Sequence, residues 1–116
     1  MTDFTNNYYL KEKLILNILK KLNLNSNLTQ RNLSKELNVS LGSINYSLKS
    51  LMLKGYVKVQ NFKKSDNKLS YMYILTPKGI AQKLELTQRF LKIKQLEYKE
   101  IQKEIVELKK ELNRGN

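Results

Sequence analysis

The chain has 116 residues, with 22 Lys and Arg against 10 Asp and Glu, a net charge of +12 and an isoelectric point near 9.9. It contains neither cysteine nor histidine, which excludes disulfides, thiolate metal sites and the side chains most used for nucleophilic and acid–base catalysis. It has no run of about 18 apolar residues and its amino-terminal segment lacks the pattern of a signal peptide, so we expect one cytoplasmic domain without a membrane span.

The first periodic segment, residues 8–22, is predicted to form an amphipathic helix. Its apolar side chains recur at spacings of three and four, which is the period of one helix face. Tyr9 and Leu16 lie off this stripe and indicate contacts on a second face. The residues of the predicted stripe are Leu14, Ile15, Ile18, Leu19 and Leu22.

Residues 28–57 predict two short capped helices separated by one tight turn. Thr29 is placed to cap a helix over 30–37, and Ser40 is placed to cap a second helix over 41–54. Because two capped helices only a turn apart must cross, we predict a helix-turn-helix whose second helix fits a DNA major groove. The expected core side chains are Leu33, Leu37, Ile44, Leu48 and Leu51, and Asn38 and Gly55 are expected to end the two helices.

Two runs rich in β-branched and aromatic residues follow, 56–62 and 69–75, joined by a polar link. A hairpin directly after a helix-turn-helix is a wing. Lys63, Lys64 and Lys68 place three cations at its tip, which predicts contacts with DNA phosphates. The alternative is that these lysines only keep an exposed loop soluble. Three aromatic side chains are expected to pack the hairpin rather than stack on bases: Phe62, Tyr71 and Tyr73.

The face of the second helix opposite its predicted core carries short or hydrogen-bonding side chains. Asn45 suits a bidentate contact with adenine, and Lys49 suits a guanine or a phosphate. Ser40 and Ser43 lie at the helix start, where backbone N–H groups favour a phosphate oxygen, and Gly42 permits close approach to DNA. The alternative is the solvated face of an ordinary three-helix domain. The predicted DNA-binding residues are Gln30, Arg31, Ser40, Gly42, Ser43, Asn45, Tyr46, Lys49, Ser50, Lys63, Lys64 and Lys68.

Thr76 and Pro77 are predicted to begin a last helix that runs to Leu112, since threonine suits the cap and proline the first helical position. Apolar side chains recur along it at sevens or at alternating threes and fours, which predicts a coiled-coil seam that pairs with a second copy. Folding back on its own domain is the alternative, and both directions of pairing stay open. Lys94 interrupts the seam and is expected to cost stability. The predicted dimerisation residues are Leu91, Tyr98, Ile101, Ile105, Leu108 and Leu112.

These elements together predict a mainly α (α+β) winged helix-turn-helix with a two-stranded β-wing and a long carboxy-terminal helix. We expect a DNA-binding domain over residues 1–76 and a dimerisation segment over 77–116. The four glycines are scattered, so no Gly-rich phosphate loop exists, and the composition offers no metal-ligating cluster. We therefore expect no enzyme activity, no cofactor and no metal.

The same motifs resemble winged-helix regulators of the MarR family. SLGSINYSLKSL at 40–51 matches that family's Ser-x-x-(Ser/Thr)-Val-x-x-x-Leu-x-x-Leu helix, and KGYV at 54–57 resembles its entry to the wing. The NFKK wing segment and LTQRFL at 86–91 resemble the small MarR-type regulators associated with exopolysaccharide gene clusters, within a match that spans most of 28–112. The wing departs from larger members in holding lysines where they carry an Asp-x-Arg motif.

The resemblance implies major-groove contacts from Ser43, Asn45, Tyr46 and Lys49, with the wing lysines as further DNA contacts. We predict a bacterial, nucleoid-associated homodimer that regulates transcription by binding specific double-stranded DNA, with residues 41–54 in the major groove and the wing, 62–69, on the backbone. Two alternatives remain, a protein-binding adaptor with a coiled-coil partner and a non-specific DNA-packing protein. The operator, any small-molecule effector, and the choice between repression and activation stay open.

Overall fold

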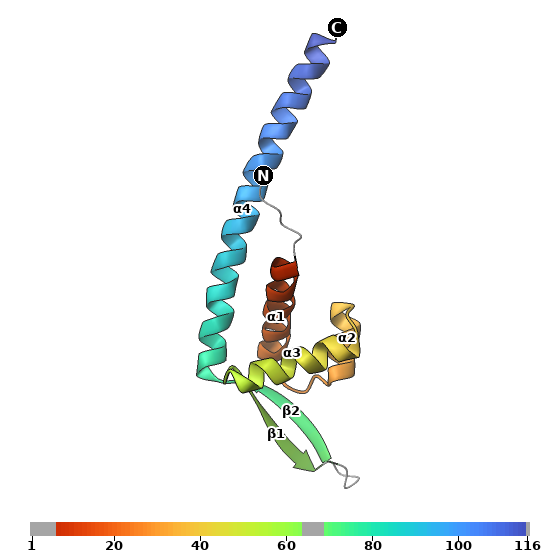
Figure 1. Ribbon diagram of the computed structural model, residues 1–116, viewed down its shortest axis with the longest axis vertical. Coiled ribbons are helices and arrows are strands. Elements are labelled where there is room, and N and C mark those ends of the chain that lie inside the picture. The colour runs from red at the N-terminus through yellow and green to blue at the C-terminus, as the bar shows by residue number, and fades with distance from the viewer. Residues whose placement is uncertain (1–6, 64–68, 116) are drawn as a thin grey trace. The chain divides into compact units, whose positions relative to one another are not determined.

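The computed structural model of the chain describes residues 7–63 and 69–115. The elements along these residues are α1 (Asn7–Leu24), α2 (Gln30–Leu37), α3 (Leu41–Leu53), β1 (Val57–Lys63), β2 (Leu69–Leu75) and α4 (Pro77–Arg114) (Figure 1). They divide into two compact units, 1–86 and 87–116. No helix within the described ranges is long and apolar enough to cross a membrane.

The helix α1 buries side chains on two faces, as predicted. Ile18, Leu19 and Leu22 of the predicted stripe are buried, and so are Tyr9 and Leu16, which lie off it. The helix contacts both α2 and β2, so a single apolar stripe is too narrow to cover its neighbours. The remaining two stripe residues, Leu14 and Ile15, are only half-buried.

Both predicted caps of the helix-turn-helix are present. The Thr29 hydroxyl accepts from the Asn32 backbone N–H at 3.0 Å, and the Asn32 side-chain oxygen accepts from the Thr29 N–H at 3.1 Å. Asparagine thus takes the place of the usual Glu or Gln in this capping box. The Ser40 hydroxyl accepts from the Ser43 N–H at 3.1 Å, and Asn38 ends α2 in a left-handed conformation, with φ of 55°.

The cores of α2 and α3 follow the prediction with two differences. Leu33, Ile44, Leu48 and Leu51 are buried, whereas Leu37 stays half-exposed at the last residue of α2. Ser47 is buried although it is polar, because it lies on the same side of α3 as the buried leucines. The helix ends at Leu53 rather than at the predicted Lys54, which is its cap before Gly55 turns the chain with φ of +79°.

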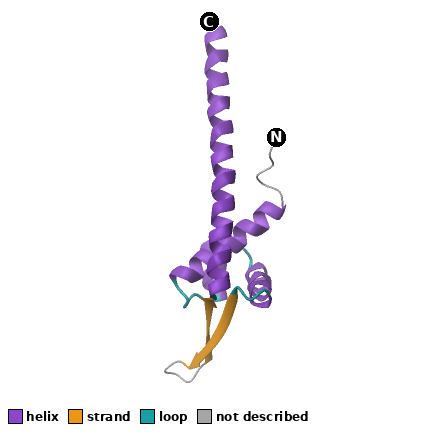
Figure 2. Ribbon diagram, turned by 90° about the vertical axis from the view of Figure 1, so that its left-hand side faces the viewer, coloured by secondary structure: helices purple, strands orange, loops and turns teal. Residues whose placement is uncertain are grey.

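The strands β1 and β2 form an antiparallel hairpin that leaves the end of α3 (Figure 2). The register places Val57 opposite Leu75 and Val59 opposite Tyr73. β2 has the predicted bounds, and β1 begins one residue late and runs to Lys63. Tyr73 is buried, in agreement with its predicted packing role, while Tyr71 is exposed. The side chain of Phe62 lies outside the described residues.

The start of α4 is bound closely to the end of α3. The Thr76 hydroxyl donates to the Gly55 carbonyl at 2.6 Å and accepts from the Gly79 N–H at 3.0 Å, so it caps α4 as predicted. Lys78 Nζ donates to the Lys54 carbonyl at 3.0 Å, which places a cation at the negative end of α3. Gly79 is buried against the Tyr56 backbone. These contacts fix where the hairpin ends and the last helix begins.

Candidate nucleic-acid interface

One face of α3 is exposed among the described residues of the first unit. Gly42, Tyr46 and Lys49 lie on the side opposite the buried residues, and 76% of the Tyr46 surface is exposed. The cap at Ser40 and the contact of Lys78 with the Lys54 carbonyl hold the two ends of this helix. The sequence therefore builds a helix, held at both ends by hydrogen bonds, that presents a phenol, a cation and a glycine to the outside.

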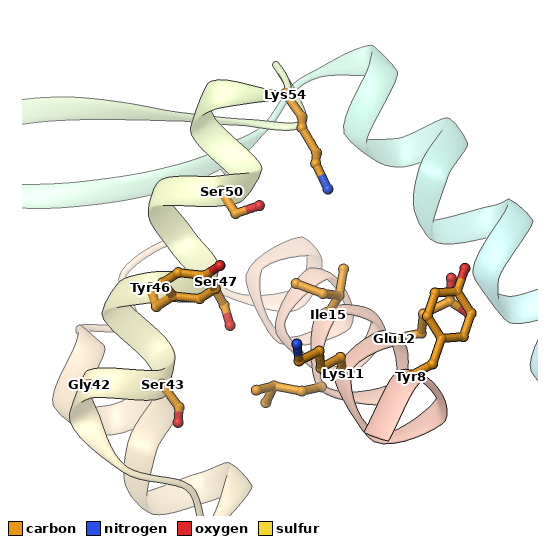
Figure 3. A pocket seen from close by; sticks show the side chains of 11 residues that line it. Tyr8, Lys11, Glu12, Ile15, Gly42, Ser43, Tyr46, Ser47, Ser50 and Lys54 are labelled. Carbon is orange, nitrogen blue, oxygen red and sulfur yellow. The ribbon is translucent and has the colours of Figure 1, made fainter. Parts of the chain in front are cut away.

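A groove runs along one edge of this face, between α3 and α1. Its volume is about 600 Å³. Figure 3 shows Ser43, Tyr46 and Ser50 on α3 at one wall, and Lys11 and Ile15 on α1 at the other. Ser43 and Ser50 thus flank the outward face rather than occupy its centre. Tyr46 and Lys49 are exposed on the outward face.

A hydrogen-bonded triad runs along the other edge of α3. Gln30 Nε2 donates to Asn45 Oδ1 at 3.3 Å and to the Tyr73 hydroxyl at 3.1 Å. Gln30 and Asn45 are half-buried, and the three residues come from α2, α3 and β2. Both amides were predicted as DNA contacts. Since the bond occupies one lone pair of the Asn45 oxygen, bidentate recognition of adenine by Asn45 would have to share that oxygen with Gln30.

The two serines at the start of α3 differ in whether the hydroxyl proton is available for a further hydrogen bond. The Ser40 hydroxyl accepts from the Ser43 N–H and donates to Ser43 Oγ at 2.9 Å, so the cap uses its proton. Ser43 Oγ accepts that bond and keeps its own proton as a donor.

Arg31, another predicted DNA contact, is exposed on α2. Of the three wing lysines, Lys63 is the last residue of β1, its side chain outside the described residues, and Lys64 and Lys68 lie outside them altogether.

The structure adds two residues to this surface that the sequence analysis missed. Leu53 is 91% exposed and lies on the outward face, seven residues after Tyr46 and four after Lys49. Lys58 is exposed on β1. An exposed leucine beside a cation suits contact with a thymine methyl group. The spacing was visible in the sequence, but the end of a helix gave no reason to assign Leu53 to either face.

The segment that contains α3 and β1 carries charge of only one sign. From Leu37 to Ser65 the chain has five lysines and no acidic residue. The nearest preceding acid, Glu36, lies 3.7 Å from Lys21 Nζ in an ion pair between α2 and α1. The segment that contains α3 and β1 therefore carries positive charge with no acid of its own to offset it, which favours a polyanion.

We expect Gln30→Ala to lower the free energy of unfolding by about 1–2 kcal/mol, because it removes two partly buried hydrogen bonds and leaves Asn45 and Tyr73 short of a donor. Urea denaturation measures this. The matched control is Arg31→Ala, the next residue and exposed, for which we expect a change within about 0.5 kcal/mol. Equal stability of the two variants would show that the triad contributes nothing measurable to the free energy of unfolding.

A family model described as winged helix-turn-helix DNA-binding matches residues 10–58. A MarR transcriptional regulator from Methanosarcina mazei Go1 superimposes with a TM-score of 0.60 at 21% identity, over 73% of this chain and 60% of that one. The chain has the MarR-type winged helix fold. The predicted fold class is therefore confirmed.

This chain covers a larger share of two other structures with the MarR-type fold. The PcaV transcriptional regulator from Streptomyces coelicolor, in complex with its natural ligand, matches with a TM-score of 0.59 at 15% identity, over 83% of this chain and 81% of that one. A variant of MepR from S. aureus, bound to an oligodeoxyribonucleotide, matches with a TM-score of 0.54 at 19% identity, over 91% and 78%. No curated protein sequence matches significantly.

Proposed function

We propose that this protein is a non-enzymatic transcription regulator that binds specific double-stranded DNA as a homodimer in the cytoplasm. The observation that carries the proposal is the outward face of α3, where Tyr46 and Lys49 project from a helix held at both ends. The acid-free basic segment from Leu37 to Ser65 supplies attraction to phosphate. The MepR variant bound to an oligodeoxyribonucleotide supports this use of the fold.

In the proposed complex α3 lies in the major groove. Tyr46 and Lys49 contact base edges, Gly42 permits close approach, and Ser43 donates to a phosphate near the helix start. The proposed wing, residues 62–69, follows the backbone with its lysines. Gln30 acts by holding Asn45 and the hairpin in place, rather than by contacting DNA itself. We retain residues 1–76 as the proposed DNA-binding domain.

We also propose that residues 77–116, which contain the whole of α4, form the dimerisation segment. Apolar side chains from Leu91 to Leu112 lie exposed along α4, and an apolar stripe of this length is typical of a protein–protein interaction surface. A two-fold pair of chains would bind a partly palindromic operator with two half-sites. The wing and the LTQRFL segment further support a place in the small subgroup associated with exopolysaccharide gene clusters.

The experiment that tests this function is a mobility shift with the DNA upstream of the protein's own gene, against random duplex, at about 150 mM salt. We expect retention that survives an excess of random competitor. Equal binding to both duplexes would favour a DNA-packing protein. Absence of any retained DNA would favour the protein-binding adaptor.

Lys63→Ala is expected to reduce the slope of log K against log salt by about one unit and leave the sequence preference unchanged, because a wing lysine on a phosphate releases about one counterion. Titrations of operator and random duplex at several salt concentrations measure both quantities. Lys110→Ala, which removes the same charge from the second unit, serves as the control. A slope that stays the same in both variants would remove Lys63 from the interface.

A further inference from the structure

The second unit of the chain presents an apolar stripe on one face of α4. Its residues, which we call the seam, are Leu91, Tyr98, Ile101, Ile105, Leu108 and Leu112, with between 46% and 73% of each side chain exposed. The proposed function requires a second copy on this face but leaves its direction open. We infer that two copies pair along the seam in parallel and in register, an inference that rests on the proposed homodimer.

The spacing of the seam assigns the heptad positions. Tyr98, Ile105 and Leu112 are separated by seven, and Ile101 and Leu108 follow the first two of them by three. The first set therefore takes positions a and the second takes positions d. The flanking positions then follow. Position g holds Glu97, Glu104 and Glu111, and position e holds Gln95, Gln102 and Lys109.

The flanking charges distinguish the two directions of pairing. In a parallel pair, position g faces position e of the other helix five residues later. Glu97 then faces Gln102, and Glu104 faces Lys109, in both symmetric copies. In an antiparallel pair, position g faces position g. With the apolar layers aligned, Glu104 meets the second copy's Glu104, and Glu97 meets its Glu111. Parallel pairing therefore gives Glu104 an oppositely charged partner and Glu97 a neutral one, whereas antiparallel pairing gives all three glutamates like-charged partners.

Lys94 is the one feature of the stripe that acts against this direction. It takes a d position, so a parallel pair brings two Lys94 side chains together. Each has a counter-ion on its own helix, because Lys94 Nζ lies 3.1 Å from Glu97 Oε2. That ion pair offsets the repulsion between the lysines. The same ion pair offsets the charge of Glu97 in an antiparallel arrangement, so the contact that separates the two directions is that of Glu104, which faces Lys109 in a parallel pair and a second Glu104 in an antiparallel one.

The direction of pairing decides how the protein spans DNA. In a parallel pair the amino-terminal ends of both α4 helices lie together, and each is joined directly to a winged-helix unit. In an antiparallel pair the two helices enter the paired segment from opposite ends, so their amino-terminal ends at Pro77 are separated by more than the length of that segment, which is about 32 Å from Leu91 to Leu112 at 1.5 Å per residue. Parallel pairing therefore predicts adjacent half-sites within one operator.

Cysteine cross-linking tests the direction, because the chain has no cysteine of its own. In the full-length protein we expect Leu112→Cys to give a disulfide-linked dimer on oxidation, since like faces like only in a parallel pair. An antiparallel pair alternates a with d and sets Leu112 against Lys94. It would therefore cross-link only a mixture of Leu112→Cys and Lys94→Cys. Lys110→Cys, on the outer face of the heptad, is the control that should not cross-link.

A charge exchange gives a second, independent readout in sedimentation equilibrium. We expect Glu104→Lys to weaken dimerisation about tenfold, by replacing two attractive contacts with repulsive ones, and the added Lys109→Glu to restore it. In an antiparallel pair Glu104→Lys only replaces a glutamate pair by a lysine pair, and the added Lys109→Glu does not restore the affinity of the dimer. A dimer with that behaviour and the mixed cross-link would overturn the parallel direction while leaving the DNA-binding proposal intact. A monomer at all concentrations would overturn the inference and the homodimer together.

Discussion

Gly79→Ala is expected to destabilise the first unit by about 3 kcal/mol and lower its melting temperature by about 15 °C, the upper end of what overpacking costs. A Cβ at this position would lie 2.0 Å from the Tyr56 carbonyl oxygen and 2.9 Å from its carbonyl carbon. Both are backbone atoms, so no side-chain rotation relieves the contact. The Tyr56 carbonyl also accepts from the Thr76 N–H at 3.1 Å, which holds the two segments together.

The higher helix propensity of alanine opposes this destabilisation. Alanine is favoured over glycine in a helix by up to about 1 kcal/mol, so the expected sign depends on the contact being the larger effect. Gly42→Ala is the matched control, because a Cβ there meets only Ser40 Oγ, at 4.0 Å. Thermal unfolding of the two variants should shift in opposite directions. Similar melting temperatures would show that the start of α4 moves away from Tyr56 at little cost.

The parts of the fold that the sequence predicted are those decided by neighbouring residues. A cap such as Thr29 or Ser40 acts on backbone groups two or three residues away, so its signal is contained in a few letters. Asn38 and Gly55 end their helices through their own backbone conformation. The bounds of α2 and β2 were therefore predicted to the residue. The outward position of Tyr46 and Lys49 followed from helical periodicity.

The parts that the sequence did not predict depend on contacts between distant segments. From the sequence Gln30 is interpreted as a surface amide, and only the fold brings it into contact with Tyr73, 43 residues away. From the sequence Gly79 is a residue of low helix propensity. In the structure the Tyr56 carbonyl lies so close that no side chain fits at this position. Ser47 is buried because its neighbours on the helix are. Local sequence patterns do not indicate such distant partners, so the hydrogen bonds of Gln30 with Asn45 and Tyr73 could not be predicted.

The double variant Tyr46→Ala/Lys49→Ala is expected to lower affinity for the operator about 100-fold and affinity for random duplex only a few-fold. Two base contacts worth about 1–3 kcal/mol each account for the first loss, and one phosphate contact accounts for the second. Because Tyr46 and Lys49 are exposed, the fold should not change, and thermal unfolding of the variant checks this. Competition binding at fixed salt measures both affinities.

The matched control for this prediction removes the same two side-chain types elsewhere. Tyr8 is 70% exposed on α1, and Lys110 is exposed in the second unit. Tyr8→Ala/Lys110→Ala should therefore reproduce the loss of a charge and an aromatic ring without the loss of operator affinity. If the α3 variant lost operator and random DNA equally, α3 would be a backbone-binding surface and sequence would have to be read elsewhere. A selective loss confined to the α3 variant instead places base recognition on the outward face of this helix.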